Sequence, residues 1–326
     1  MDIPVIKTSG TPQERGHTYG QQAAKQINES AKFYADLFNL TLQELETQGN
    51  NYKKQIAAIN PSYNQEIAAI ARASNQPEGI IYAINARTEI RSYAHECTSL
   101  ADPQNNLYAQ TWDWAAHQEN QLIILHHTNP DGHEFISVTE AGMLAKIGLS
   151  STGLSVCLNA LPANGTLPGT PIHILLRAAL DAKTLMQAQE LLAQHHQTAG
   201  NILLGTTNNT YYNFEQAIND VHTYQGTTRF AHTNHYLNNP PTKPTSTQDR
   251  YNQATKLLRN KNNTAQEILA NEQGTNPIKR AYKHKEKFGL HGTVCTVLLE
   301  PATGRMRVEK TNQQPGVYQE ITLDKQ

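Results

Sequence analysis

The sequence is poor in cysteine, in net charge and in long apolar runs, and each shortage excludes a class of protein. Its 326 residues contain three cysteines, Cys97, Cys157 and Cys295, too few and too scattered for a disulfide scaffold, which indicates a reducing compartment. The formal net charge is −1, so neither nucleic acid nor an anionic membrane is expected as a partner. No apolar run approaches the roughly 18–20 residues of a membrane span, and the N-terminus lacks a signal-peptide pattern. We therefore expect a soluble, cytoplasmic protein.

The first ninety residues have the patterns of helices. Thr11-Pro12-Gln13-Glu14 predicts a helix start with a capping box and a proline in the first turn. Apolar residues at three- and four-residue steps predict that this helix continues towards Leu40. Gly16 and Gly20 lie four residues apart in its first half, where small residues let another backbone approach. Further helices are expected from Thr41, after Asn60-Pro61 and from Pro77 to about Tyr93.

After Cys97 the hydrophobic period changes to two, which predicts strands. The expected strands before the next helices are 107–112, 121–126, 134–138, 145–149 and 153–158. Helices then return, further strands follow, two more helices begin near Ser246 and Thr264, and strands close the chain. This order of elements predicts two sheets packed between helical layers, in a single domain that spans residues 1–326.

Cys97 occupies the junction between the helical part and the strand-rich part of the chain, in Glu96-Cys97-Thr98-Ser99. If the peptide bond before it were cut, Cys97 would carry a free α-amine. Such an amine has an unperturbed pKa of about 7.7–8.0 and can take the proton of the thiol. Taken alone, however, a cysteine is more often a small buried core residue. The hypothesis that Cys97 is a nucleophile therefore depends on the groups that accompany it.

Three such groups follow along the chain. Asp113 stands between two tryptophans at a strand end, where it is either bonded by backbone amides or directed at a cation. Asn234 follows a strand; its carboxamide can donate to an oxyanion, although asparagine at this place also forms turns. Glu140-Ala141-Gly142, together with the glycine-containing segment 148–154, predicts tight turns that either line a site or belong to simple hairpins.

Fourteen histidines suggest a metal site, but their spacing argues against one. No His-Glu-x-x-His pattern occurs, and no Cys-x-x-Cys motif accompanies the candidate pairs His126-His127, His195-His196 and His232/His235. Adjacent histidines on a strand point to opposite faces and cannot bind one ion together. Neither of the common glycine-rich phosphate loops is present. We expect no metal and no cofactor, whereas a cysteine–histidine pair formed by the fold stays open.

In their order along the chain these segments resemble the acyl-CoA:6-aminopenicillanate acyltransferase family, also called the isopenicillin N acyltransferase family or peptidase family C45, which belongs to the N-terminal nucleophile hydrolases. The similarity covers nearly the whole chain and begins with the glycine-spaced opening helix. The segments that carry it are Gly10, Gly16 and Gly20, Asn85-Ala86-Arg87-Thr88-Glu89, Glu96-Cys97-Thr98-Ser99, Thr111-Trp112-Asp113-Trp114, Glu140-Ala141-Gly142, Lys146-Ile147-Gly148-Leu149, 153–161 and Thr233-Asn234-His235.

The resemblance implies an α+β fold, a four-layer αββα sandwich, made as a precursor that cuts itself before the cysteine. Residues 1–96 would then form a mostly helical chain and residues 97–326 a second chain. Carried over by position, Cys97 is the nucleophile, Asp113 lies near the new amine, and Asn234 helps to form the oxyanion hole. One position departs from the pattern: Glu96 stands where the penicillin enzyme has glycine, and glutamate resists strained backbone.

The predicted activity is hydrolysis of a small N-acyl amide or peptide through an S-acyl enzyme. An acyl-CoA-dependent N-acyltransferase would differ only in the acceptor, and hydrolysis is preferred because no basic cluster for the CoA phosphates stands out. A further alternative is an unprocessed, catalytically silent binding protein of the same fold. The expected partners are the acyl amide or peptide and the two fragments of the chain itself, with acyl-CoA and a second copy left open.

Overall fold

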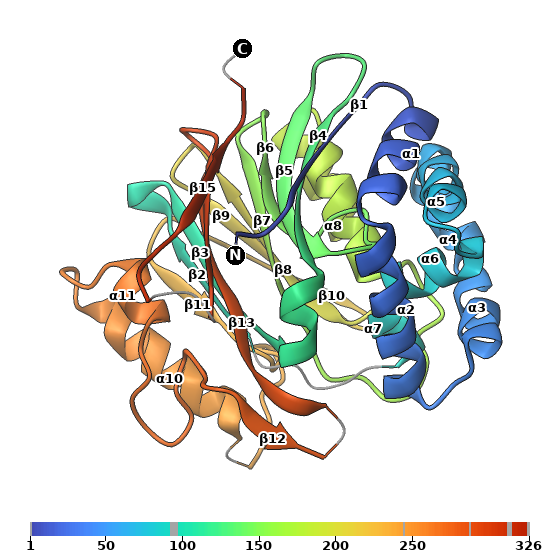
Figure 1. Ribbon diagram of the computed structural model, residues 1–326. Helices are drawn as coiled ribbons and strands as arrows, with labels where there is room; N and C mark the ends of the chain where they lie inside the picture. Colours follow the sequence, from blue (N-terminus) through green and yellow to red (C-terminus); the bar gives the residue numbers. More distant parts are fainter. Residues whose placement is uncertain (1, 92–96, 244, 287, 312–314, 325–326) are drawn as a thin grey trace.

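The computed structural model describes residues 2–91, 97–243, 245–286, 288–311 and 315–324, whose strands form two stacked sheets (Figure 1). In the first sheet the spatial order is β1 (Val5–Ser9), β4 (Leu122–Thr128), β5 (Glu134–Glu140), β6 (Ile147–Ser150), β7 (Leu154–Asn159), β8 (Gly200–Thr206), β9 (Tyr211–Gln216) and β10 (Val221–Gly226). In the second it is β11 (Phe230–His232), β2 (Thr98–Asp102), β3 (Leu107–Ala115), β13 (Gly289–Glu300), β14 (Arg305–Lys310) and β15 (Gln319–Thr322), with β12 (Lys283–Lys285) beside β13. All pairings described are antiparallel except that of β1 with β4.

Helices cover the outer face of each sheet. The first sheet is covered by α1 (Pro12–Gln22), α2 (Ala24–Phe38), α3 (Leu42–Asn50), α4 (Lys53–Ile59), α5 (Pro61–Ala73), α6 (Glu78–Asn85), α7 (Arg87–Ile90), α8 (Ile172–Asp181) and α9 (Leu185–Ala193). The second is covered by α10 (Ser246–Arg259) and α11 (Ala265–Leu269), and the short 3₁₀ turns are η1 (Pro103–Asn105) and η2 (Ala116–Gln121). The αββα sandwich implied by the sequence is confirmed (Figure 1).

The central strands of the first sheet are buried on both faces. Strands β5, β7 and β8 have no exposed residue, because α8 packs on one side of this sheet and the second sheet, through β2, β3 and β13, packs on the other. Doubly covered strands can be apolar without alternation, which explains continuous runs such as Leu122-Ile123-Ile124-Leu125 in β4. The centre of the first sheet is therefore shielded from solvent on both faces.

The first helix begins as predicted but is divided into two. The capping box forms, with Thr11 Oγ1 accepting from the Glu14 main chain and the Glu14 carboxylate accepting from Thr11 N at 2.7 Å. The single helix expected to reach Leu40 is wrong, because the chain breaks at Ala23 into α1 and α2. The break lets α1 pack on α5 while α2 turns to contact η2 and α6.

The close approach predicted for the two glycines of this helix is confirmed. A Cβ on Gly16 would lie 2.4 Å from the carbonyl oxygen of Glu66, and one on Gly20 would lie 2.5 Å from that of Ile70. Any side chain at either position would therefore push α1 away from α5. This contact fixes Glu66, which lies at the centre of a buried ionic cluster.

Two further expectations need correction. The helix expected over residues 77–93 is interrupted at Ala86, and residues 92–93 lie outside the described part of the chain. Strand β10, an edge strand with a partly exposed pattern, was not predicted, because its polar sequence Val221-His222-Thr223-Tyr224-Gln225-Gly226 resembles a loop. Within the described residues no helix has the length and apolar character that crossing a membrane requires.

Candidate active site

The topology of the second sheet brings Cys97, Asp113 and Asn234 together. Cys97 immediately precedes β2, which lies between β3 and β11. Strand β3 carries Asp113, and Thr98 pairs with Thr111 two residues before it. Strand β11 ends at His232, opposite Ser99, so Asn234 follows at the same end of the sheet. The three predicted residues, which span more than a hundred positions of sequence, therefore meet at one end of the neighbouring strands β11, β2 and β3.

Asn234 holds the main-chain nitrogen of Cys97. The Cys97 N–H donates to Asn234 Oδ1 at 2.7 Å, and Asn234 Nδ2 donates to the carbonyl oxygen of Ala160 at 2.9 Å. The two bonds fix which end of the carboxamide faces the cysteine. Among the described residues, Nδ2 has this one partner, and its second N–H is left for another acceptor. Asn234 is 7 % exposed, so its side chain is largely inaccessible to solvent.

Asp113 is buried, and only one of its carboxylate oxygens is bonded. Oδ1 accepts from Thr293 Oγ1 at 2.7 Å, whereas Oδ2 has no hydrogen-bond partner among the described residues. Burial raises the pKa of Asp113 to about 7, although Arg250 and the Thr293 bond act in the opposite direction. The pairing of β3 with β13 shifts register between Thr293 and Cys295, and such an irregularity redirects the side chains around it.

Arg250, on α10, is a site residue that the sequence analysis did not identify. Its Nη1 donates to the carbonyl oxygen of Cys97 at 2.8 Å and to Thr98 Oγ1 at 3.1 Å, and its Nη2 donates to Asn234 Oδ1 at 3.0 Å. The side chain is fully buried. A signal was present in the sequence, because Arg250 shares one helix face with Ala254 and Leu258, which form the buried stripe of α10.

The environment of Cys97 keeps its thiol protonated in the uncut chain. The residue is 5 % exposed. Burial raises the pKa of the Cys97 thiol, and the charge of Asp113 adds to the increase. A hydrogen bond from the main chain of Asp113 and the charges of Lys146 and Arg250 act against it, without reversing it. A thiolate at this position therefore needs a nearby base.

Glu140, in the predicted segment Glu140-Ala141-Gly142, belongs to a buried ionic cluster rather than to a simple hairpin. Its carboxylate accepts from Lys146 Nζ at 3.2 Å and from Arg87 Nη2 at 3.0 Å, and also bonds to the Tyr34 hydroxyl. The Lys146 ammonium lies 3.2 Å from the centre of the Trp112 ring. Burial lowers the pKa of Lys146 to about 7. The cluster therefore places cationic groups beside the residues that flank Asp113.

The remaining candidates make no side-chain hydrogen bond to Cys97, Asp113 or Asn234 among the described residues. Glu96 lies outside the described residues. Cys157 and Cys295 are fully buried, and burial raises the pKa of both thiols. His232 bonds to Glu215 and His196 to the carbonyl oxygen of Leu191, and in the described part of the chain no hydrogen bond joins Cys97 to a histidine.

Comparison with known proteins gives a family match. Residues 100–314 match the family model described as "Acyl-coenzyme A:6-aminopenicillanic acid acyl-transferase", a stretch that includes Asp113 and Asn234 and starts just after Cys97. The chain is also similar to the acyl-coenzyme A:6-aminopenicillanic-acid-acyltransferase 40 kDa form of Emericella nidulans, with 29 % identity over 250 residues that cover 72 % of this chain and 70 % of that one.

Solved structures with some likeness have low sequence identity. A mutant form of the conjugated bile acid hydrolase from Clostridium perfringens matches with a TM-score of 0.49 and 9 % identity, over 71 % of this chain and 93 % of that one. The Caenorhabditis elegans orthologue of N-acylethanolamine-hydrolyzing acid amidase matches with a TM-score of 0.48 and 17 % identity, over 63 % and 93 %.

Proposed function

Because the chain belongs to the acyl-coenzyme A:6-aminopenicillanic acid acyl-transferase family, we propose that it is an autoprocessing N-terminal cysteine amidohydrolase acting on a small N-acyl amide or peptide. The observation that supports this most directly is the 2.7 Å hydrogen bond from the Cys97 main-chain nitrogen to Asn234 Oδ1. In the mature enzyme this nitrogen would be the α-amine, and it is already held next to the thiol by a buried carboxamide.

In the maturation step, the Cys97 sulfur attacks the carbonyl carbon of residue 96. The peptide C–N bond breaks, a thioester forms, and the proton of the thiol passes to the Cys97 nitrogen, which becomes the α-amine. Water then hydrolyses the thioester, which releases the carboxylate of residue 96 and restores the thiol. Arg250 supports this step because it holds the Cys97 carbonyl oxygen and Asn234 at the same time, so the main chain on both sides of the cysteine α-carbon is fixed.

In the catalytic step, the new α-amine takes the proton of the Cys97 thiol. The free Oδ2 of Asp113 is available to accept from the resulting ammonium, and this charge would lower the raised pKa of the carboxyl. The thiolate attacks the substrate carbonyl, and the second N–H of Asn234 Nδ2 donates to the oxyanion. The C–N bond of the substrate breaks, the leaving amine takes the proton, and water hydrolyses the S-acyl enzyme.

Acyl transfer is the second candidate, and the family match and the similarity to the Emericella nidulans acyltransferase favour it. The two reactions share the S-acyl enzyme and differ in whether water or an amine resolves it. Consumption of an acyl thioester with and without an added amine separates them: a transferase requires the amine, whereas a hydrolase consumes the thioester without it.

The cysteines are all unpaired, which supports a reducing, cytoplasmic location.

Intact mass and N-terminal sequencing of the purified protein test the proposal. Cleavage before Cys97 divides the 36.3 kDa chain in the proportion 96 to 230, which gives fragments of about 11 and 26 kDa, the larger beginning Cys-Thr-Ser. The Cys97→Ala variant should stay intact, whereas Cys157→Ala, a matched change of another buried cysteine, should be cleaved normally. An intact wild-type chain that no thiol-reactive amide labels would instead indicate a silent binding protein.

A further inference from the structure

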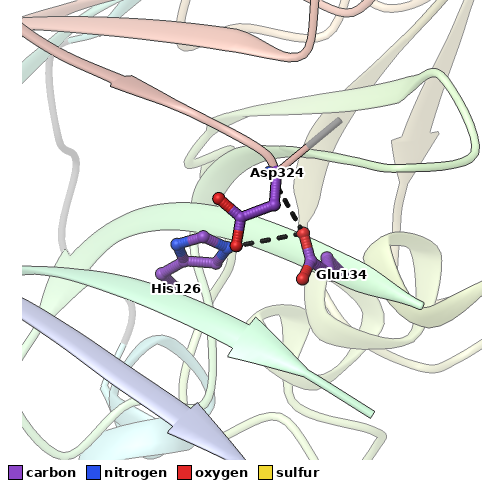
Figure 2. Close-up of side chains that lie close together, drawn as sticks. All are labelled: His126, Glu134 and Asp324. Atoms are coloured by element: carbon purple, nitrogen blue, oxygen red, sulfur yellow. Dashed lines mark hydrogen bonds and ion pairs between the residues drawn. The ribbon is translucent and has the colours of Figure 1, made fainter. Parts of the chain in front are cut away.

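A histidine and two carboxylates converge at the side of the first sheet (Figure 2). His126 comes from β4, Glu134 from β5, and Asp324 follows β15, the last strand of the second sheet. Each supplies one potential ligand atom, and these three atoms all lie within 4.8 Å of one another. The three side chains therefore come from three separate segments and point at one small volume.

The strand register explains how the first two residues meet. Glu134 pairs with Thr128, so Glu134 and His126 are diagonal neighbours on the same face of the sheet. Glu134 Oε2 lies 3.5 Å from His126 Nε2 and accepts from the Asp324 main-chain N–H at 3.3 Å. The other carboxylate oxygen, Oε1, accepts from Thr128 Oγ1 at 3.2 Å. The carboxylate is thus fixed so that Oε2 faces the histidine.

His126 supplies a second and independent observation. Its side chain is only 3 % exposed, and neither ring nitrogen has a hydrogen-bond partner among the described residues. Such an imidazole, buried and without a hydrogen bond, leaves both ring nitrogens available to a water or an ion. The next residue, His127, differs because its ring has polar partners. It points to the helical layer, where its Nε2 lies 3.1 Å from Arg177 Nη2 and 3.2 Å from Asn129 Oδ1. Figure 2 shows the His126 ring beside both carboxylates.

We propose that His126, Glu134 and Asp324 bind a divalent transition-metal cation, for which Zn²⁺ fits the donors best. Zinc takes histidine nitrogen and carboxylate oxygen at about 2.0–2.2 Å, so two tetrahedral ligands lie roughly 3.4 Å apart, close to the 3.5 Å between His126 and Glu134. Two carboxylates balance the charge of the ion. Calcium and magnesium prefer shells made of oxygen alone, which the imidazole does not provide. Asp324 is exposed, so water can complete the coordination.

Such an ion would fasten the segment after β15 to the first sheet. In that segment Leu323 N donates to the carbonyl oxygen of Gly304, next to β14 of the second sheet, and within β15 the Gln319 side chain bonds to the main chain of Ile3. In the described residues no hydrogen bond or ion pair connects the three ligands to Cys97, Asp113 or Asn234. The site therefore acts on the stability of the fold and does not depend on the proposed reaction.

Calorimetric titration of the full, chelator-treated protein with Zn²⁺ tests the proposal. The wild-type chain should bind one ion, and His126→Gln and Asp324→Asn should each weaken binding by about 100-fold or more. Zn²⁺ should also raise the thermal unfolding midpoint of the wild-type protein and of neither variant. His291→Gln is the matched control, because His291 is equally buried and without a hydrogen-bond partner among the described residues, but the charges near it are those of Lys285, Arg280 and Arg250.

The proposal is overturned if the wild-type chain binds no Zn²⁺, or if both variants bind it as tightly as the wild type does. A larger response to Ca²⁺ than to Zn²⁺ would also overturn it, since the histidine would then have no part in binding. Asp324 is exposed at the edge of the fold, so Asp324→Asn remains informative even if His126→Gln does not fold.

Discussion

Two buried carboxylates, Glu66 on α5 and Asp113 on β3, lie in different parts of the molecule, and their pKa values are shifted in opposite directions. Glu66 is enclosed by the helical layer and accepts from Arg177 at 3.0 and 3.1 Å and from Arg15 at 3.1 Å. Burial alone would raise the pKa of Glu66, but the charge of Arg177 lowers it to about 2, with smaller contributions from His127 and Arg15. Asp113 has one hydrogen-bonded oxygen within the described part of the chain, and burial raises its pKa to about 7.

The arginines beside these carboxylates show the same contrast. Burial disfavours the charge of both, but Asp181 and Glu66 raise the pKa of Arg177, whereas the pKa of Arg250 remains lowered. Arg177 makes ion pairs with carboxylates, and the hydrogen bonds of Arg250 go to carbonyl, hydroxyl and carboxamide oxygens. A satisfied ion cluster serves the structure, whereas a buried charge left partly unsatisfied costs stability, a cost that the proposed reaction would explain at Asp113.

The largest effect is expected for Glu66→Gln. The change removes the carboxylate that Arg15 pairs with and leaves Arg177 with Asp181 alone, which should cost about 3–5 kcal/mol of unfolding free energy. Urea unfolding measures it best in the Cys97→Ala background, where the chain stays in one piece.

Glu29→Gln is the matched control for this change. Glu29 pairs with Lys32 at 3.1 Å on the surface of α2, so the same substitution should produce no measurable change in stability. If Glu66→Gln costs no more than Glu29→Gln, the ionic cluster is not structural and the comparison with Asp113 fails.

The second prediction concerns Arg250→Lys. A lysine cannot donate in a fixed fork to Cys97 O, Thr98 Oγ1 and Asn234 Oδ1 together, so self-cleavage should slow about 100-fold, equivalent to about 2.7 kcal/mol. The appearance of the 26 kDa fragment over time measures the rate. Arg259→Lys, an exposed change on the same helix, should leave the rate unaltered. Equal self-cleavage rates in the two variants would show that Arg250 has no part in the reaction.

Much of this arrangement could be predicted from the sequence. Cys97, Asp113 and Asn234 were identified because each stands beside a distinctive local pattern, and the structure places them together; their catalytic roles, and a single domain, stay predictions. Arg250 was missed because its partners come from β2 and the loop after β11, so only its place on the buried face of α10 marked it.

Contacts between distant segments account for the other differences. Nothing in the sequence around Ala23 indicates the break between α1 and α2, since it follows from packing on α5 and η2. The convergence of His126, Glu134 and Asp324 likewise depends on how the chain after β15 crosses to the first sheet. Spacing along the sequence compares only neighbouring residues, so it carries no information about a site assembled from β4, β5 and the segment after β15.

A smaller effect, of opposite sign, is expected for Asp113→Asn in the Cys97→Ala background. The variant no longer buries a charge, so its stability at pH 8 should rise by about 1 kcal/mol over that of the parent, as measured by urea unfolding. With Cys97 present, the same change should lower amide turnover. Asp36→Asn, at an exposed position of α2, is the control and should change neither quantity. A loss of stability in Asp113→Asn would show that the carboxylate is structural, like Glu66.

The pH dependence of these stability differences is the sharpest test of the comparison. The pKa of Asp113 is raised in the folded chain, so its favourable contribution is present at low pH and is lost as the pH rises from about 4 through 7. The pKa of Glu66 is lowered, so its contribution is present above about 4.5 and is lost as the pH falls towards 2.

Because each group changes by one proton, the free-energy difference between parent and variant should vary by at most about 1.4 kcal/mol per pH unit, and only in its own window. Differences are needed because other buried groups titrate too: burial also raises the pKa of Glu89 to about 7, in the window of Asp113. Relative to Asp113→Asn, the parent should lose stability as the pH rises from 4 to 7. Relative to Glu66→Gln, it should lose stability as the pH falls from 4.5 to 2. If the two free-energy differences changed with pH in the same direction, the two carboxylates would have similar environments. The contrast between the ion-paired Glu66 and the partly unbonded Asp113 would then be wrong.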